Sequence, residues 1–351
     1  MKRFLLLTVL SLYIIFSSSD AQAGNPDRQG ESGAYELLIN PWARSAGLGT
    51  IGSSSVRGVD GMHFNVAGMS RVGNTEISLG HTIYLQGTTV SVNSLGLTQP
   101  IGKSGTIGVS LMALNFGDIL VTTTSQPEGT GATFSPNFFN LAVGYSHIFA
   151  NKISVGLLAR MVNESTSDVS ASGVAFDAGV QYVSGEKDNF HLGISLRNIG
   201  SQLSFGGEGL AFQGQNAGVA YPLSYEQRSA GFELPSMLNI GLAYDFYPAN
   251  KIKLSTLGNF TSNAFSKDQL GLGLELEYNK MFTLRAGYNK EIGKTANNNT
   301  LGNSVYTGLS GGLSVDIPLS RENKRSFAVD YAYQATRVFG GTHNIGIRFG
   351  F

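Results

Sequence analysis

The sequence contains no cysteine and a single tryptophan, and only 14% of its 351 residues are charged. Without cysteine, the chain has no disulfide, no thiolate metal ligand, no cysteine nucleophile and no lipidated N-terminal cysteine. Lysine plus arginine balance aspartate plus glutamate at 24 each, so the formal net charge is zero. The basic surface of a nucleic-acid-binding protein is therefore not indicated. Beyond the N-terminus, no apolar run approaches the ~18 residues that a membrane-spanning helix needs.

Glycine and aromatic residues are abundant instead. There are 46 glycines, 21 phenylalanines and 14 tyrosines. The glycine share is roughly twice the usual value of about 7%. Many glycines and aromatics with few charges favour strands that curve and face lipid.

The N-terminus has the pattern of a secretory signal peptide. Lys2 and Arg3 give it a positive start, residues 4–16 are apolar, and residues 21–23 form an A-x-A cleavage site. The apolar part is too short to cross a bilayer as a helix, which needs about 20 residues. We therefore expect residues 1–23 to be removed from an exported chain.

The last residues of the chain alternate strictly between apolar and small or charged side chains. Ile345, Ile347, Phe349 and Phe351 share one face of a strand, whereas Gly346, Arg348 and Gly350 share the other. A chain end frays unless it is tied down, and a closed barrel ties it down by pairing the last strand with the first. We interpret Phe349 and Phe351 as a barrel-insertion signal on the closing strand.

Similar alternation recurs in segments of about ten residues, which is the signature of an outer-membrane barrel. We predict strands near residues 75–83, 89–98, 105–115, 138–148, 152–162, 173–183, 189–198, 237–247, 251–260, 269–279, 281–289, 306–317, 325–334 and 343–351. Short connections alternate with longer ones, over residues 116–137, 163–172, 199–236, 261–268, 290–305 and 335–342. The expected fold is all-β, a transmembrane antiparallel β-barrel of about 14 strands, with residues 74–351 forming the barrel.

A soluble sandwich of two sheets would show the same alternation with its faces reversed. The signal peptide, the terminal Phe351, the loop asymmetry and the glycine-rich polar face favour the barrel. In that case the charged strand residues line a small, polar lumen and neutralise one another across it. These residues are Arg160, Asp177, Arg197, Asp245, Lys253, Glu275, Glu277, Arg285, Asp316, Asp330 and Arg348.

Residues 24–73 do not alternate and are rich in glycine and other small residues. This composition predicts a compact plug, or hatch, with tight turns, placed in the lumen or at its periplasmic mouth. A disordered periplasmic tail is the alternative, but it would be more charged and less apolar.

No catalytic or metal-binding pattern is present. The histidines, which are His63, His81, His147, His191 and His343, lack a metal-ligand spacing, and no serine has a G-x-S-x-G setting. We therefore predict that the chain is not an enzyme and that it binds no metal or cofactor.

Two of the long loops carry many apolar residues, which indicates either a contact surface for a partner or a lid over the mouth. The candidate contact residues are Ile119, Leu120, Val121 and Phe134 in loop 116–137, and Leu203, Phe205, Phe212, Tyr221, Tyr225 and Phe232 in loop 199–236.

Three stretches resemble the PorV/PorQ family of Bacteroidota outer-membrane proteins, which are relatives of the FadL transporters. The first pairs Ala43-Arg44-Ser45-Ala46-Gly47-Leu48-Gly49 with Asn65-Val66-Ala67-Gly68-Met69; the others are Phe116-Gly117-Asp118 with residues 127–131, and Leu234-Pro235 with residues 241–244. By this resemblance, Arg44, Gly47, Gly49, Asn65 and Gly68 form the plug motif. Val66 departs from the family's usual proline.

The resemblance implies a fourteen-stranded barrel with an N-terminal hatch in the outer membrane of a diderm bacterium, with a periplasmic C-terminus. It also implies an adaptor subunit that docks on a type IX secretion translocon and handles cargo by its C-terminal signal. Two alternatives stay open. One is an accessory subunit of the barrel-assembly machinery, and the other is a FadL-like passive channel for a small hydrophobic solute. The expected partners are a larger outer-membrane complex, exported cargo and membrane lipid, without nucleic acid.

Overall fold

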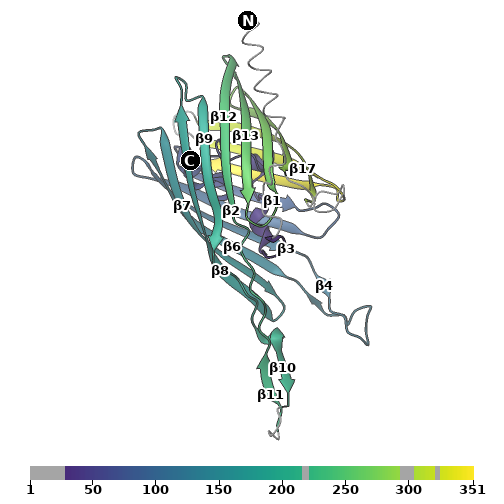
Figure 1. Cartoon of the computed structure of the whole chain (residues 1–351). Helices are drawn as coiled ribbons and strands as arrows, with labels where there is room; N and C mark the ends of the chain where they lie inside the picture. The colour runs from purple at the N-terminus through teal and green to yellow at the C-terminus, as the bar shows by residue number, and fades with distance from the viewer. Residues whose placement is uncertain (1–27, 216–220, 293–303, 321–324) are drawn as a thin grey trace.

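The computed structural model describes residues 28–215, 221–292, 304–320 and 325–351, and its main body is a closed antiparallel barrel (Figure 1). The predicted signal peptide lies outside the described residues. Fourteen strands form the wall, in the order β1-β18-β17-β16-β15-β14-β13-β12-β9-β8-β7-β6-β3-β2. Their bounds are β1 (Glu76–Ile83), β2 (Ser91–Ile101), β3 (Gly105–Asn115), β6 (Asn137–Phe149), β7 (Ile153–Thr166), β8 (Val169–Ser184), β9 (Phe190–Gly200), β12 (Met237–Ala249), β13 (Ile252–Asn263), β14 (Asp268–Tyr278), β15 (Phe282–Ile292), β16 (Tyr306–Ser320), β17 (Arg325–Thr336) and β18 (Thr342–Gly350). Each corresponds to one predicted segment, so the fold prediction is confirmed.

The last strand closes the barrel against the first. All eight residues of β1 pair with β18, from Glu76 opposite Gly350 to Ile83 opposite His343. Beyond β18, the backbone N–H of Phe351 donates to the carbonyl of Thr75 at 2.9 Å. The chain end is therefore held by hydrogen bonds to the first strand.

Short turns such as 150–152 lie at one end of the barrel, here called the short-turn end. Loops 116–136 and 201–236 lie at the other, the long-loop end. One predicted loop is wrong: most of residues 163–172 continue β7 and β8, which pair up to Thr166 opposite Val169. A two-residue turn joins these strands, and Ser167 at φ 48° supplies its left-handed position.

The outer face of the wall is apolar. Leu157, Leu272 and Leu284 are all more than half exposed, as are several other outward aliphatic side chains. The charged strand residues that were predicted to point into the lumen are buried or half-buried, in agreement with the alternation of side chains along the strands. A closed barrel with this exterior is suited to lipid. No helix of the described residues is long and apolar enough to cross a bilayer.

The polarity of the two faces reverses near the long-loop end. There Val92, Met112 and Leu114 point inward and are buried, whereas their neighbours Asn93 and Asn115 point outward and are exposed. The prediction of a polar lumen is therefore wrong for this end. The physical reason is that a wall that rises beyond the lipid meets water outside, so its apolar side chains face inward as in a soluble protein.

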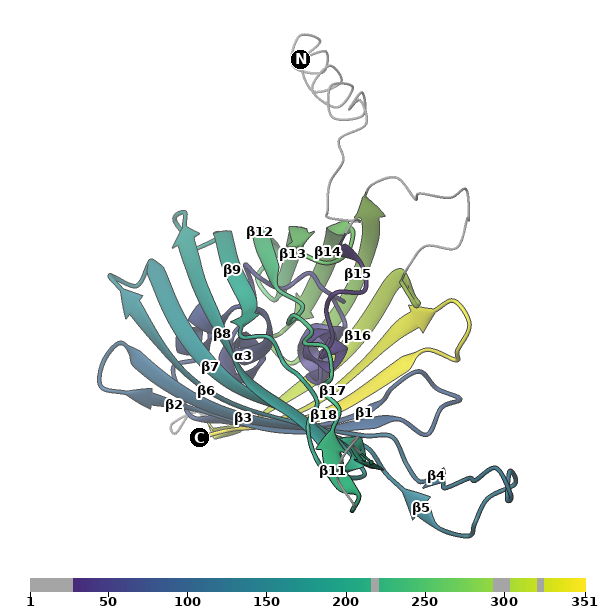
Figure 2. The same ribbon diagram turned by 60° about the horizontal axis from the view of Figure 1, so that its bottom comes forward.

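Residues 28–75 form a hatch that runs through the lumen from end to end. Ser32 bridges to Glu233 at the long-loop end, and the chain then descends to Glu76, which starts β1 at the short-turn end. Figure 2 shows helix α3 inside the ring of strands. The hatch elements are η2 (Tyr35–Leu38), α2 (Ala43–Ala46), η3 (Gly58–Asp60), α3 (Gly61–Phe64) and η4 (Val66–Arg71).

Two hairpins project from the long-loop end and were not predicted (Figures 1 and 2). One pairs β4 (Ile119–Leu120) with β5 (Thr133–Phe134). The other pairs β10 (Ala211–Gly214) with β11 (Leu223–Glu226), after a short helix η5 (Glu208–Leu210).

Candidate functional site: a hatch within the lumen

Buried ion pairs fasten the hatch to the wall. Arg44 of α2 contacts Asp60 of the hatch at 2.5 Å and Glu76 of β1 at 3.3 Å. Glu76 also lies 3.7 Å from Arg348 of β18, which contacts Asp330 of β17 at 2.6 Å. Burial disfavours the charged form of Arg44, but the carboxylates of Asp60 and Glu76 outweigh it and raise the pKa of Arg44. The guanidinium therefore stays charged and joins the hatch to the strands that close the barrel.

Glycines let the hatch backbone approach the wall closely. A side chain on Gly47 would reach within 2.9 Å of the Cα of Gly312 on β16. Gly49 adopts φ +66°, and a Cβ there would lie 2.7 Å from the amide of Asn289. The plug-motif glycines thus occupy positions where any larger residue would push the hatch away from β15 and β16.

Asn65 attaches the hatch to two further strands. Its Nδ2 donates to the carbonyls of Val180 on β8 at 3.1 Å and Ile194 on β9 at 3.3 Å. Its Oδ1 accepts from the N–H of Ala67 at 3.2 Å, which caps η4. A Cβ on the nearby Gly68 would lie 2.2 Å from the carbonyl oxygen of Val56. Gly68 therefore packs mainly within the hatch and faces the wall only at Gln181 of β8, whereas the other plug-motif residues lie where the hatch contacts the wall.

Apolar contacts complete the fit. Val66, which stands where the family pattern has proline, packs in a buried cluster with Met62, Met69, Ala142 and Leu158. A second cluster, at the long-loop end, joins the hatch to the wall and to loop 201–236. Its buried members are Ala34, Leu37, Val162, Ala171, Ala175, Leu203 and Leu234, and Phe205 and Phe232 pack against it.

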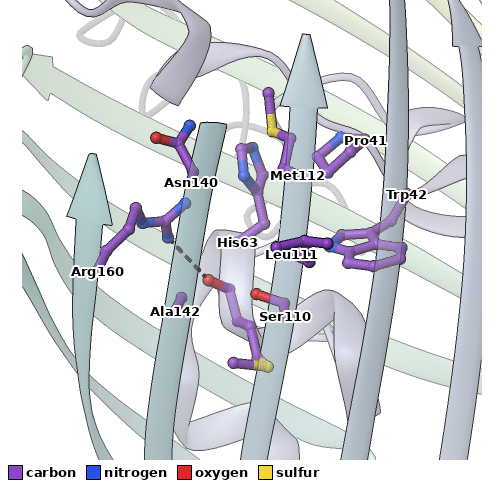
Figure 3. A pocket seen from close by; sticks show the side chains of 10 residues that line it. Pro41, Trp42, His63, Ser110, Leu111, Met112, Asn140, Ala142 and Arg160 are labelled. Carbon is purple, nitrogen blue, oxygen red and sulfur yellow. Dashed lines mark hydrogen bonds between the residues drawn. The ribbon is translucent and has the colours of Figure 1, made fainter. Parts of the chain in front are cut away.

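A cavity of about 280 Å³ lies between the hatch and the wall at the short-turn end. Charged and hydroxyl side chains line most of it, including Arg57, Lys253 and Glu275. Toward the long-loop end lies a second cavity, of about 10 Å³, beside His63 and Arg160 (Figure 3). It has room for about one water molecule. This second cavity is therefore too small to admit a solute.

His63 is enclosed in the hatch, 4% exposed. Burial, together with the positive charges of Arg197 and Arg160, lowers its pKa well below the ordinary histidine value. The ring is therefore neutral at physiological pH.

Among the described residues, the polar group of Ser255, Asp245 and His191 resembles a catalytic triad in composition but is arranged differently. Ser255 donates to Asp245 at 2.5 Å, and His191 Nε2 lies 3.2 Å from the other oxygen of Asp245. The carboxylate stands between serine and histidine, so the imidazole does not contact the hydroxyl as a general base would. Among the described residues no three potential metal-ligating side chains come together.

The candidate contact residues of the loops fall into two groups. Exposed or half-buried positions on the projecting parts are Ile119, Leu120, Val121, Phe134, Phe212, Tyr221 and Tyr225. Leu203 is 1% exposed, and Phe205 and Phe232 pack against the same cluster. These three residues belong to the inside of the fold, because loop 201–236 folds back over the start of the hatch. As described, Leu203 offers no surface to a partner.

Sequence reasoning missed the residues at the start of the hatch. Gly33, Glu36 and Leu37 contact the loop and the wall, yet no motif or alternation marks them. The only signal was the isolated charge of Glu36 beside the apolar Leu37 and Leu38.

The fold and its contents define a membrane-spanning β-barrel of the outer-membrane type, closed by an internal hatch. No family profile matches the chain, and no curated protein matches it. Solved structures of hydrocarbon channels do share its architecture. The CymD monoaromatic hydrocarbon channel aligns at a TM-score of 0.55 and 17% identity, covering 89% of this chain and 97% of its own.

Two further structures agree. The Pseudomonas putida toluene transporter TodX aligns at a TM-score of 0.55 and 14% identity, over 94% of this chain and 99% of its own. A Pseudomonas aeruginosa FadL homologue aligns at 0.50 and 12% identity, over 89% and 97%. The chain therefore has a FadL-like barrel fold.

Proposed function

We propose that the protein is a passive outer-membrane channel for a small hydrophobic solute, and that the hatch keeps it closed. The observation that carries this proposal is the apolar interior at the long-loop end. Val92, Met112 and Leu114 form a buried cluster there, with Ile39 of the hatch and Phe138 packed against it. An apolar solute leaves water favourably at such a surface.

The structures that share the fold support the same function, because CymD is described as a monoaromatic hydrocarbon channel and TodX as a toluene transporter. In this chain, the apolar cluster would receive the solute and the hatch would have to shift for it to pass. The polar cavity at the short-turn end does not suit a hydrophobic molecule. We therefore place the binding step at the long-loop end.

Uptake of radiolabelled toluene by cells that lack other such channels tests the proposal. We expect Val92→Trp to lower the initial rate toward the vector background, because the added volume fills the apolar interior. Val109→Trp is the matched control, since Val109 lies on the adjacent strand with its side chain exposed on the outer face. A wild-type rate equal to background, with the protein present in the membrane, would reject the channel.

A second candidate is the adaptor function, and the projecting hairpins favour it. Phe212 and Tyr225 stack at 5.6 Å on the β10–β11 hairpin, and Phe212 is 55% exposed. An isolated two-stranded hairpin is marginally stable in water, so a partner would stabilise it. On this proposal the protein is a PorV/PorQ-like barrel of the outer membrane of a Bacteroidota species, with its C-terminus in the periplasm. Its partner is a type IX secretion translocon with exported cargo, or the barrel-assembly machinery.

A gentle-detergent pull-down of a tagged copy expressed from its own locus tests this second function. A stoichiometric large partner identified by mass spectrometry would support it, and the identity of that partner would separate secretion from barrel assembly. Recovery of the barrel alone would count against it.

A further inference from the structure

The start of the hatch is bound to loop 201–236 by a run of backbone hydrogen bonds. The N–H of Gly33 donates to the carbonyl of Glu233 at 3.0 Å, and the N–H of Glu233 donates to Glu31 at 3.0 Å. Next to this contact, Leu203 and Phe232 exchange two hydrogen bonds at 2.8–2.9 Å. The start of the hatch is therefore joined to the loop by a parallel β-bridge between Ser32 and Glu233, and the loop is joined in turn to β8 by a bridge between Gly206 and Ser170.

Side chains reinforce this contact. A Cβ on Gly33 would lie 2.4 Å from the ring of Phe232, so the ring packs directly on the glycine. Leu37 is 1% exposed, and its carbonyl accepts from Arg197 of β9 at 3.3 Å. Residues 31–37, here called the strap, thus pack beneath the loop and against the wall.

Two carboxyl groups meet at the base of the strap. Glu36 is 3% exposed and Glu164 of β7 is 5% exposed. The Glu36 carboxyl interacts with the carboxyl of Glu164 and with its own backbone N–H, and neither of its oxygens has another hydrogen-bond partner among the described residues. Glu164 also faces the backbone N–H of Ala34. Two carboxylates cannot both ionise at such close range in a buried site, so one proton between them is needed.

The neighbouring arginines do not neutralise the two carboxyl groups in place of that proton, because they are bound elsewhere. The positive charge of Arg160 on β7 lowers the pKa of Glu36 by a minor amount. Arg160 already contacts Asp177 of β8 at 2.9 Å and donates to the carbonyl of Met62 at 3.1 Å. Arg197 donates to the carbonyl of Leu37.

The other titratable groups near the strap are neutral or engaged elsewhere. His63, beside Arg197, is neutral. The strap's own Glu31 contacts Arg28 at 2.7 Å. In the loop, Glu233 accepts from Gln202 at 2.7 Å.

We propose that the strap is a proton-dependent latch: a proton shared by Glu36 and Glu164 allows residues 31–37 to dock under loop 201–236, and its loss releases them. The latch does not depend on what the barrel transports.

The direction of the pH effect follows from the burial of Glu36. Burial, followed by the charge of Glu164, raises the pKa of Glu36 from 4.5 to about 8 in the docked strap. An undocked strap ionises near the ordinary value. Docking is therefore strongest below about pH 4.5. The docking equilibrium constant falls about tenfold per pH unit above that value and changes no further above about pH 8.

The mobility of a nitroxide label at residue 35 reports directly whether the strap is docked. Tyr35 is half exposed, and the chain contains no cysteine, so Tyr35→Cys gives a single attachment site. We expect the electron paramagnetic resonance spectrum of the purified barrel to be immobile at pH 5 and to gain a mobile component up to pH 8. In the same labelled protein, Glu36→Gln and Glu164→Gln should each keep the label immobile throughout.

Two further variants complete the experiment. Gly33→Val, which clashes with Phe232, should make the label mobile at every pH, whereas Gly73→Val, with open space around its Cβ, should not. A spectrum that does not change with pH in the wild type would overturn the proposal. So would a pH response that persists in both glutamine variants, or an immobile label in Gly33→Val. Because the label reports the strap and not transport, a failed uptake experiment leaves this result unaffected.

Discussion

At the scale of single residues, parity along the strands predicted which charges point inward. Arg348 and Asp330 lie on the inner face as expected, and they contact each other. Their partners in the hatch were beyond the reach of sequence reasoning, because parity gives the face of a side chain but not what stands opposite it. The contact of Arg44 with Glu76 joins positions 32 residues apart across a segment without periodicity. Only the folded hatch brings them together.

Loss of Arg44 should release the hatch. In Arg44→Met, the buried carboxylates of Asp60 and Glu76 lose their nearest hatch cation, which for a buried pair costs about 3–5 kcal/mol. We expect frequent opening, seen as increased ion conductance of single barrels in planar bilayers. Lys152→Met is the matched control, because Lys152 makes an exposed pair with Asp188 and should conduct like the wild type. Equal conductance in the two variants would mean that other contacts hold the hatch.

At the scale of elements, the fourteen wall strands were predictable because lipid outside and a packed lumen inside impose an alternation of period two. The reversal of polarity at the long-loop ends of the strands was not predicted, because the alternation of period two continues there with the apolar side chains on the inner face. In β6, the exposed outward residue near the long-loop end is the polar Asn137, beside the large apolar Phe138 on the inner face, whereas further along the strand the exposed outward residue is the apolar Leu141. This exchange is visible in the sequence, and it locates the edge of the lipid-facing band.

Short elements escaped prediction for a different reason. Strands β4 and β5 have two residues each, and β10 and β11 have four. Such lengths are too short to show a period. In the hatch, helices of four residues form because the wall encloses them, not because of local propensity.

The terminal strand should decide how well the barrel assembles. Phe349 pairs with both neighbouring strands, and its ring packs against that of Phe327 in a tilted arrangement with the centroids 5.3 Å apart, while Phe351 follows at the exposed end. If these residues are the insertion signal, Phe349→Ala with Phe351→Ala should lower the amount of folded barrel in outer-membrane fractions, measured by heat-modifiable migration. Phe246→Ala, an exposed aromatic change on β12, controls for lost hydrophobicity. The proposal fails if both proteins accumulate equally.

At the scale of the whole molecule, loop 201–236 combines two separable parts. Its ends hold the hatch through Leu203 and Phe232, whereas its middle forms the β10–β11 hairpin away from the barrel. The ends of the hairpin segment lie close together, since Ser229 Oγ donates to the carbonyl of Phe205 at 2.8 Å. A short linker can therefore replace the hairpin, residues 211–226, and leave the hydrogen bond from Gly209 to the carbonyl of Asp168 at 3.2 Å in place.

This replacement separates the two proposed functions. A channel keeps its apolar interior, latch and hatch, so toluene uptake by the shortened protein should equal that of the wild type. An adaptor loses Phe212 and Tyr225, so a large partner found with the full-length protein should be absent from its pull-down. The shortened barrel must migrate as a folded, heat-modifiable protein for either comparison to count. Retained partner together with lost uptake would contradict both assignments, because it would place solute entry on the hairpin and docking elsewhere.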